Sequence, residues 1–277
     1  MPALSTRAGR MTYSWNGIAP DAEATPALVL IHGAGGQARD WPAEWRYRSN
    51  AAQTLGVRTL PETHALSGRA VYALDLPGHG GSDPLPDGAP TVGRLAETVL
   101  EAADALGLEQ PVLAGHSMGG GIALTAAVQA PEKVGGLVII GSSARLPVTD
   151  QILDGLTSDF DATVDMIVKF SWAKMAPAVY RETGRRHMKA CGPDQVLADF
   201  TACAAYDARE GLSAITVPVL VLAGERDKMV PQAASEKLVA GLGDATLDVV
   251  AGAGHFMHFE QPGRVARSIE TFMAQKF

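Results

Sequence analysis

The chain has 277 residues, of which 47% are apolar and 19% are charged, and this balance excludes a disordered or fibrous protein. The formal net charge is −7, and the sequence contains no basic run. We therefore expect neither nucleic acid nor an anionic membrane as a partner. The length fits one large domain, or one domain with an insertion.

The lack of a recognisable targeting signal and the low cysteine content lead us to expect a cytoplasmic location. The first 15 residues hold no apolar stretch of the kind found in signal peptides. No window reaches the ~18 apolar residues that a membrane span needs. The two cysteines, Cys191 and Cys203, are too few for a disulfide framework, so both are expected to be reduced thiols.

Short apolar runs along the chain predict strands. Most of them are continuous rather than alternating in polarity, which is typical of strands buried on both faces of a parallel sheet. The predicted strands are 27–31, 70–74, 112–114, 137–140, 219–223 and 246–250.

Helical patterns alternate with these runs, over 91–106, 120–130, 230–241 and 265–277. In the first of them Leu95, Val99, Ala102 and Leu106 recur at helical spacing, and Gly107 ends the pattern. Strand followed by helix over most of the length predicts an α/β fold, with a mostly parallel central sheet and helices on both of its faces.

The stretch from Ser143 to Gly211 breaks this alternation, because it holds helical patterns and no convincing strand. We expect an all-helical cap over residues 143–211, inserted into a core made of residues 1–142 and 212–277. Large side chains in this stretch are candidates for substrate binding, and they could equally form the cap's own small core. The candidates are Trp172, Met175, Tyr180 and Met188.

The first motif that can carry chemistry is GHSMG at positions 115–119. It directly follows a predicted strand and precedes a helical pattern. A serine at such a sharp turn is held in a strained backbone conformation, and the glycines two places before and after it relieve clashes. Ser117 is therefore a candidate nucleophile.

The sequence IHGAGG at 31–36 also follows a predicted strand. Positions 33–38 fit the dinucleotide fingerprint G-x-G-x-x-A, which requires an acidic residue about 20 positions further on. Ala52, Gln53 and Thr54 stand there instead. We favour the other interpretation, a loop whose backbone N–H groups face a developing oxyanion.

Two further strand ends offer an acid and a base. Asp227 follows the predicted strand 219–223, and His255 follows the last one. A carboxylate at such a position can orient a histidine, although a solvated loop carboxylate paired with Arg226 or Lys228 also explains Asp227. His258 is expected to pack or to cap a helix. The sequence shows no spacing typical of metal ligands, so we expect no metal site.

Ser117, Asp227 and His255 follow one another as nucleophile, acid and base, each at the carboxyl end of a predicted parallel strand. This order, the G-x-S-x-G turn, the His32-Gly33 loop, the DLPGHGGS turn at 75–82 and the GERD sequence at 224–227 resemble the α/β-hydrolase superfamily. The resemblance runs from about residue 11 to residue 277.

The resemblance implies a role for each residue. Ser117 would attack a carbonyl carbon, His255 would take its proton, and Asp227 would orient His255. The backbone N–H groups of Ala34 and Met118 would form an oxyanion hole. Neither a metal nor an organic cofactor is implied.

Serine at position 117 excludes the dehalogenases and epoxide hydrolases of this fold, which use Asp there. Hydrolysis of esters, thioesters or lactones, C–C bond hydrolysis of ring-cleavage products, and perhydrolysis remain. We predict a carboxylesterase for a small-molecule ester with a short to medium uncharged acyl group. A hydrolase-like ligand receptor is the non-enzyme alternative, and the sequence carries no signal for an oligomeric state.

Overall fold

The computed structural model describes residues 1–20, 25–47, 66 and 68–277. Its centre is an eight-stranded sheet with the strand order β1-β2-β4-β3-β5-β6-β7-β8. β1 pairs with β2 and β2 with β4 in antiparallel fashion, and the remaining pairs are parallel. The strands are β1 (Ala3–Thr6), β2 (Gly9–Trp15), β3 (Leu28–Ile31), β4 (Val71–Leu74), β5 (Val112–His116), β6 (Gly136–Ile140), β7 (Val219–Gly224) and β8 (Ala245–Val250).

The predicted α/β fold is confirmed, and each predicted strand is present within two residues of its expected bounds. Every residue of β3, β4, β5, β6 and β7 is buried, as the continuous apolar runs indicated. The sequence did not predict β1 and β2. These strands are partly polar and partly exposed, and they form an antiparallel edge of the sheet.

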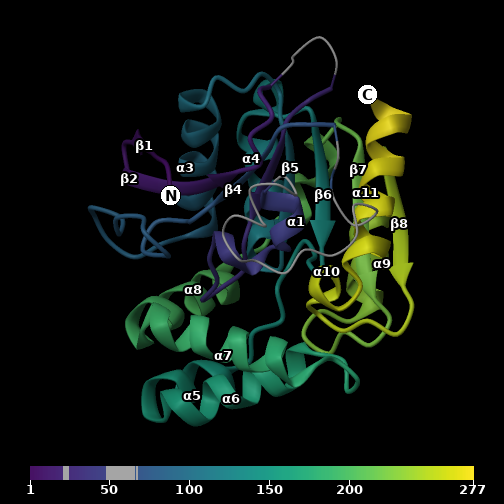
Figure 1. The fold of residues 1–277 in the computed structure, drawn as a ribbon. Helices are drawn as coiled ribbons and strands as arrows, with labels where there is room; N and C mark the ends of the chain where they lie inside the picture. Colours follow the sequence, from purple (N-terminus) through teal and green to yellow (C-terminus); the bar gives the residue numbers. More distant parts are fainter. Residues whose placement is uncertain (21–24, 48–65, 67) are drawn as a thin grey trace.

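Helices cover both faces of the sheet (Figure 1). Alternate residues of β3 show why both faces need cover. Val29 and Ile31 belong to one apolar cluster, together with residues of α3 and α4. Leu28 and Leu30 belong to a second cluster, together with residues of α1 and α11. Within the described residues, the α-helices outside the inserted segment are α1 (Ala43–Arg46), α3 (Val92–Ala105), α4 (Met118–Gln129), α9 (Gln232–Ala240), α10 (Met257–Glu260) and α11 (Pro262–Lys276).

The stretch expected to be a cap is helical. It contains α5 (Asp150–Ser158), α6 (Phe160–Ser171), α7 (Ala178–Cys191) and α8 (Pro193–Ala205). This α5–α8 segment lies beyond the carboxyl ends of the parallel strands (Figure 1). Its two ends meet, because Arg145 and Asp207 form an isolated antiparallel bridge. In the described part of the chain no helix is both long and apolar enough to cross a membrane.

Candidate functional site

Ser117 stands at a strained turn between β5 and α4. Its φ is 54° and its ψ is −118°, and its N–H donates to the carbonyl of Ile140 at 2.9 Å. A Cβ at Gly115 would lie 2.0 Å from the carbonyl oxygen of Gly119, and one at Gly119 would lie 2.1 Å from that of Ile31. The two flanking glycines are therefore required for the turn, as the motif predicted.

Asp227 and His255 are joined by a hydrogen bond. His255 Nδ1 lies 2.8 Å from Asp227 Oδ2, and both side chains are buried. Asp227 Oδ1 accepts hydrogen bonds from the backbone N–H groups of Met229 and Val230, at 2.8 and 2.9 Å. Asp227 is thus not a solvated loop carboxylate. Since a carboxylate can only accept, His255 carries a proton on Nδ1 and leaves Nε2 free to accept one.

Two other histidines surround His255 and stay neutral. His116 Nε2 donates to the carbonyl of His255 at 3.0 Å, and the two rings lie 4.6 Å apart. Burial, reinforced by the neighbouring His258 and His255, lowers the pKa of His116 well below its ordinary value. Burial likewise lowers the pKa of His258 to about 3, and this ring packs against Trp41. The backbone N–H of His255 donates to the carbonyl of Ser171 at 2.9 Å, so α6 helps to hold it.

The loop after β3 lies against Ser117. A Cβ at Gly33 would be 3.1 Å from Ser117 Cβ. Among the described residues, the N–H groups of Ala34 and Met118 have no hydrogen-bond acceptor. The loop leads into the three-residue 3-10 turn η1 (Ala38–Asp40) rather than the helix that a dinucleotide site needs. Positions 52–54, which counted against such a site in the sequence, lie outside the described residues.

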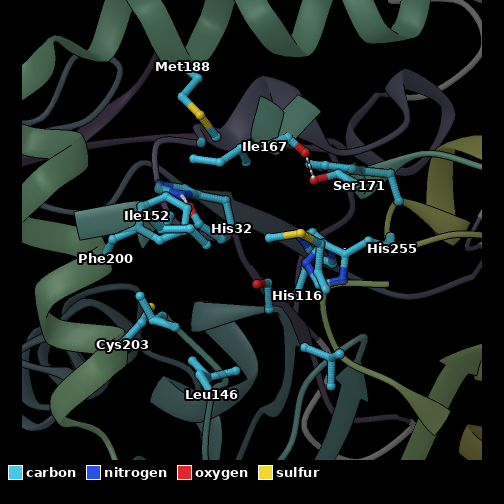
Figure 2. A pocket seen from close by; sticks show the side chains of 18 of the residues that line it. His32, His116, Leu146, Ile152, Ile167, Ser171, Met188, Phe200, Cys203 and His255 are labelled. Atoms are coloured by element: carbon cyan, nitrogen blue, oxygen red, sulfur yellow. Dashed lines mark hydrogen bonds between the residues drawn. The ribbon is translucent and has the colours of Figure 1, made fainter. Parts of the chain in front are cut away.

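A cavity of about 70 Å³ separates this loop and Ser117 from the α5–α8 segment. Figure 2 shows Met188 and Ile167 on one side, Leu146 and Cys203 on another, and His116 with His255 beside them. Asp40 is the acidic side chain of the wall, and none of the described lining residues is Lys or Arg. The apolar side chains of the wall are Ala34, Leu146, Pro147, Val148, Ile152, Ile167, Met188, Phe200, Met229, Val230 and Phe256.

Of the four side chains proposed to contact a substrate, Met188 lines the cavity and the other three do not. Met175 is 83% exposed, so its expected role has no support in the structure. Trp172 stacks on Phe256 at 4.6 Å and packs beside Tyr180, one layer behind the cavity wall. The sequence analysis did not single out the wall residues Asp40, Leu146, Ile152, Ile167 and Phe200. For Ile152, Ile167 and Phe200 the reason is that a wall residue and a core residue follow the same pattern on an amphipathic helix. Asp40 and Leu146 lie outside the α-helices and carry no periodic signal.

Both cysteines are free thiols, as expected. Cys203 lines the cavity, and burial raises the pKa of its thiol, so it stays protonated. Within the described ranges no group of three or more His, Cys, Asp or Glu side chains is arranged to hold a metal ion.

Comparison with known proteins supplies a family. The family model described as "Alpha/beta hydrolase family" matches residues 28–268. A 2-hydroxymuconate semialdehyde hydrolase from Pseudomonas putida is 29% identical over 270 residues, covering 91% of this chain and 88% of that protein. A 2-hydroxy-6-oxo-6-phenylhexa-2,4-dienoate hydrolase from Comamonas testosteroni is 28% identical over 265 residues, covering 90% and 88%. A solved structure described as a thermophilic esterase superimposes with a TM-score of 0.78 at 25% identity, covering 96% and 94%.

Proposed function

This chain belongs to the alpha/beta hydrolase family, and on that premise we propose that it hydrolyses a carboxylic ester of a small uncharged molecule. The catalytic residues in this proposal are Ser117, His255 and Asp227. One observation carries it: the His255–Asp227 hydrogen bond lies at a cavity that also exposes the strained Ser117. A nucleophile, a base and an acid that orients the base are the parts that acyl transfer through a serine needs.

The reaction follows from these positions. Ser117 Oγ adds to the ester carbonyl carbon while His255 Nε2 takes the hydroxyl proton. Asp227 stabilises the imidazolium, and the free N–H groups of Ala34 and Met118 bind the oxyanion. The intermediate collapses to an acyl-enzyme, and the alcohol leaves with the proton from His255. A water molecule then repeats the sequence, and the carboxylic acid is released.

The cavity supports a short acyl group. A volume of about 70 Å³ holds only a few groups the size of water, and its walls are mostly apolar. Phe200, Ile152 and Met188 close it on the side of the α5–α8 segment. We propose that this segment acts as a cap that sets the acyl length, with Met188 as a contact. A palmitoyl chain is too large for this volume and would have to extend out of the cavity.

C–C bond hydrolysis of ring-cleavage products is the second candidate, because two relatives are named as hydrolases of 2-hydroxymuconate semialdehyde and of 2-hydroxy-6-oxo-6-phenylhexa-2,4-dienoate. The names of their substrates include a muconate semialdehyde and a dienoate, which are carboxylates at neutral pH. Here the described wall offers Asp40 and no Lys or Arg, so a carboxylate substrate would meet repulsion rather than an ion pair. The basic residues Arg185 and Lys189 bind the acids Asp165 and Asp161 on the outer side of α6 and α7.

A chain-length series tests the proposal. We expect kcat/KM on aryl esters from acetate to palmitate to be highest at a short chain, in the presence or absence of a chelator. Ser117→Ala should lower kcat by several orders of magnitude with an unchanged melting temperature. Ser143→Ala is the matched control, since this buried serine donates to the Arg145 carbonyl and does not line the cavity.

Three results would contradict the proposal. Cleavage of a dienoate without ester turnover would replace it with C–C hydrolysis. A maximum at palmitate would indicate a lipase. Tight ligand binding with no turnover of any ester would favour the receptor alternative.

A further inference from the structure

One buried carboxylate near the cavity has no part in the reaction described above. Asp199, on α8, is completely buried and accepts three hydrogen bonds. Its Oδ2 accepts from the N–H of Gly35 at 2.7 Å and lies 2.8 Å from His79 Nε2. Its Oδ1 accepts from Gln195 Nε2 at 2.9 Å. Asp199 therefore links the α5–α8 segment to two loops of the core.

His79 supplies the balancing charge. Burial alone would lower the pKa of His79, but the Asp199 carboxylate raises it well above its ordinary value. Burial alone would raise the pKa of Asp199, and His79 lowers it instead. Since burying an ion pair gives little net stability over an apolar pair of the same size, stability alone is a weak reason for this arrangement. The geometry at Gly35 offers a stronger one.

Gly35 is the third residue of a tight turn. The N–H of Gly36 donates to the Gly33 carbonyl at 3.1 Å, and Gly35 has a φ of +62°. Turns of this kind have two forms that differ by a flip of the central peptide, here the one between Ala34 and Gly35. Asp199 binds the N–H of that peptide. A flipped peptide would turn the Ala34 carbonyl towards the carboxylate, so Asp199 selects one form of the turn.

The preceding peptide is fixed as well. His32 Nδ1 donates to the Gly33 carbonyl at 2.8 Å, while His32 Nε2 accepts from the N–H of Leu76 at 3.0 Å. Because the N–H and C=O of a trans peptide point in opposite directions, the Ala34 N–H is directed away from His32. Ala34 itself lines the cavity. Both peptide planes that flank Ala34 thus depend on hydrogen bonds with buried side chains: His32 donates to the first, and Asp199 accepts from the second.

Resting on the ester hydrolysis proposed above, we propose that Asp199 is a positioning residue for the oxyanion hole. By holding the Gly35 N–H, it fixes the peptide that follows Ala34, while His32 fixes the peptide before it, and together they keep the Ala34 N–H aimed at the negative charge that develops on the substrate oxygen. It can do so only while α8 is seated on the loop. The oxyanion hole is therefore complete only when the α5–α8 segment is packed against the loop after β3.

Two substitutions at this position separate the hydrogen bond from the charge. Asp199→Ala removes the acceptor for the Gly35 N–H, and we expect kcat to fall about 10- to 100-fold while KM stays within about twofold, since losing an entire oxyanion donor costs about 10²- to 10³-fold. Asp199→Asn keeps an oxygen in front of Gly35 and His79, with its amide N–H turned to Gln195. We expect kcat within about fivefold of the unchanged protein. Asp199→Ser, whose hydroxyl is too short to reach Gly35, replaces the Ala variant if that variant does not fold.

Inhibitors give a readout that loosened packing would not move. A short-chain trifluoromethyl ketone accepts Ser117 Oγ at its carbonyl carbon and forms an anionic hemiketal, with the serine proton passing to His255. Its Ki should rise in Asp199→Ala by the same factor as kcat falls. The Ki of the corresponding alcohol, which develops no negative charge, should not change.

His187→Gln is the matched control. His187 on α7 binds Asp40 at 2.5 Å, so this variant also breaks a His–Asp contact between the segment and the core. We expect it to lower the melting temperature and to leave the ratio of the two Ki values unchanged. If Asp199→Ala keeps both kcat and that ratio while Ser117→Ala is inactive, the positioning role is wrong and the proposed function stands. If Ser117→Ala is fully active, the proposed function itself is wrong.

Discussion

Replacing Asp227 with Asn removes a charge without changing the shape of the side chain, and the structure determines how the amide must sit. Asp227 Oδ1 accepts from the N–H groups of Met229 and Val230. Only the oxygen of an Asn can take that place, so its NH2 group must face His255. His255 Nδ1 then has to accept a hydrogen bond, and its proton moves to Nε2. In this tautomer Nε2 cannot take the proton of Ser117.

The magnitude follows from these contacts. The opposite amide orientation would leave two buried N–H groups without acceptors, at about 1–3 kcal/mol each, so the orientation is fixed by about 2–6 kcal/mol. A base held in the wrong tautomer costs about 10⁴-fold in kcat in the Ser-His-Asp template, which corresponds to about 5.4 kcal/mol of activation free energy. Stability should change little, because the shape and the two backbone hydrogen bonds are kept.

The assay is kcat on a short aryl ester together with the melting temperature of each variant. Asp248→Asn is the matched control. Asp248 on β8 binds Arg264 and Ser268 on α11 and does not contact His255. We expect that control to stay within about threefold of the unchanged protein. An Asp227→Asn protein that keeps a tenth of its activity would refute the tautomer argument. One that unfolds would show that Asp227 is needed mainly for the fold of its loop.

Three further outcomes are expected. Gly119→Ala should prevent folding, since its Cβ would lie 2.1 Å from a β3 carbonyl oxygen, whereas Gly243→Ala, which meets nothing within 4 Å, should express and melt normally. His79 has a raised pKa in the folded protein, so its contribution is fully present below about pH 6.5 and is lost as the pH rises through the raised value. Urea unfolding from pH 6.5 upwards should show a falling free energy of unfolding, with a slope of at most about 1.4 kcal/mol per pH unit, and His79→Gln should abolish that slope. Phe200→Ala should enlarge the cavity and move the preferred acyl chain up by about two or three methylenes, measured with the same ester series; an unchanged profile would contradict Phe200 as the end wall.

The parallel sheet and the candidate catalytic residues were predictable because their signals are local. A run such as residues 219–223 identifies a buried strand by itself, and the residue that follows such a strand lies at the edge where the loops meet. β1 and β2 gave no comparable signal. Half-exposed strands such as β2, with Arg10, Thr12 and Ser14 between its apolar residues, resemble a polar loop in composition.

The cavity wall was not predictable for a different reason. Trp172, directly after α6, and Phe200, on α8, are both large and buried in the same segment, yet Phe200 lines the cavity and Trp172 lies behind Phe256. Which of them faces the cavity depends on how α6 and α8 rotate and pack, and a single sequence does not encode that in any local pattern. The role proposed for Asp199 is of the same kind, because its partner Gly35 is 164 positions away.

If the chain hydrolyses esters as proposed, its acyl selectivity and its catalytic geometry are coupled. Met188 forms part of the wall, and its Cγ would lie 2.9 Å from a Cβ at Gly35, so the wall touches the turn that presents Ala34. The next helix, α8, carries both Phe200 of the wall and Asp199. Since interiors are packed too tightly to shift one side chain alone, a substitution that moves α7 or α8 to admit a longer acyl group also moves the acceptor of the Gly35 N–H. Substitutions in this segment that change the acyl specificity should therefore lower kcat unless α8 keeps its position against the Gly35 turn.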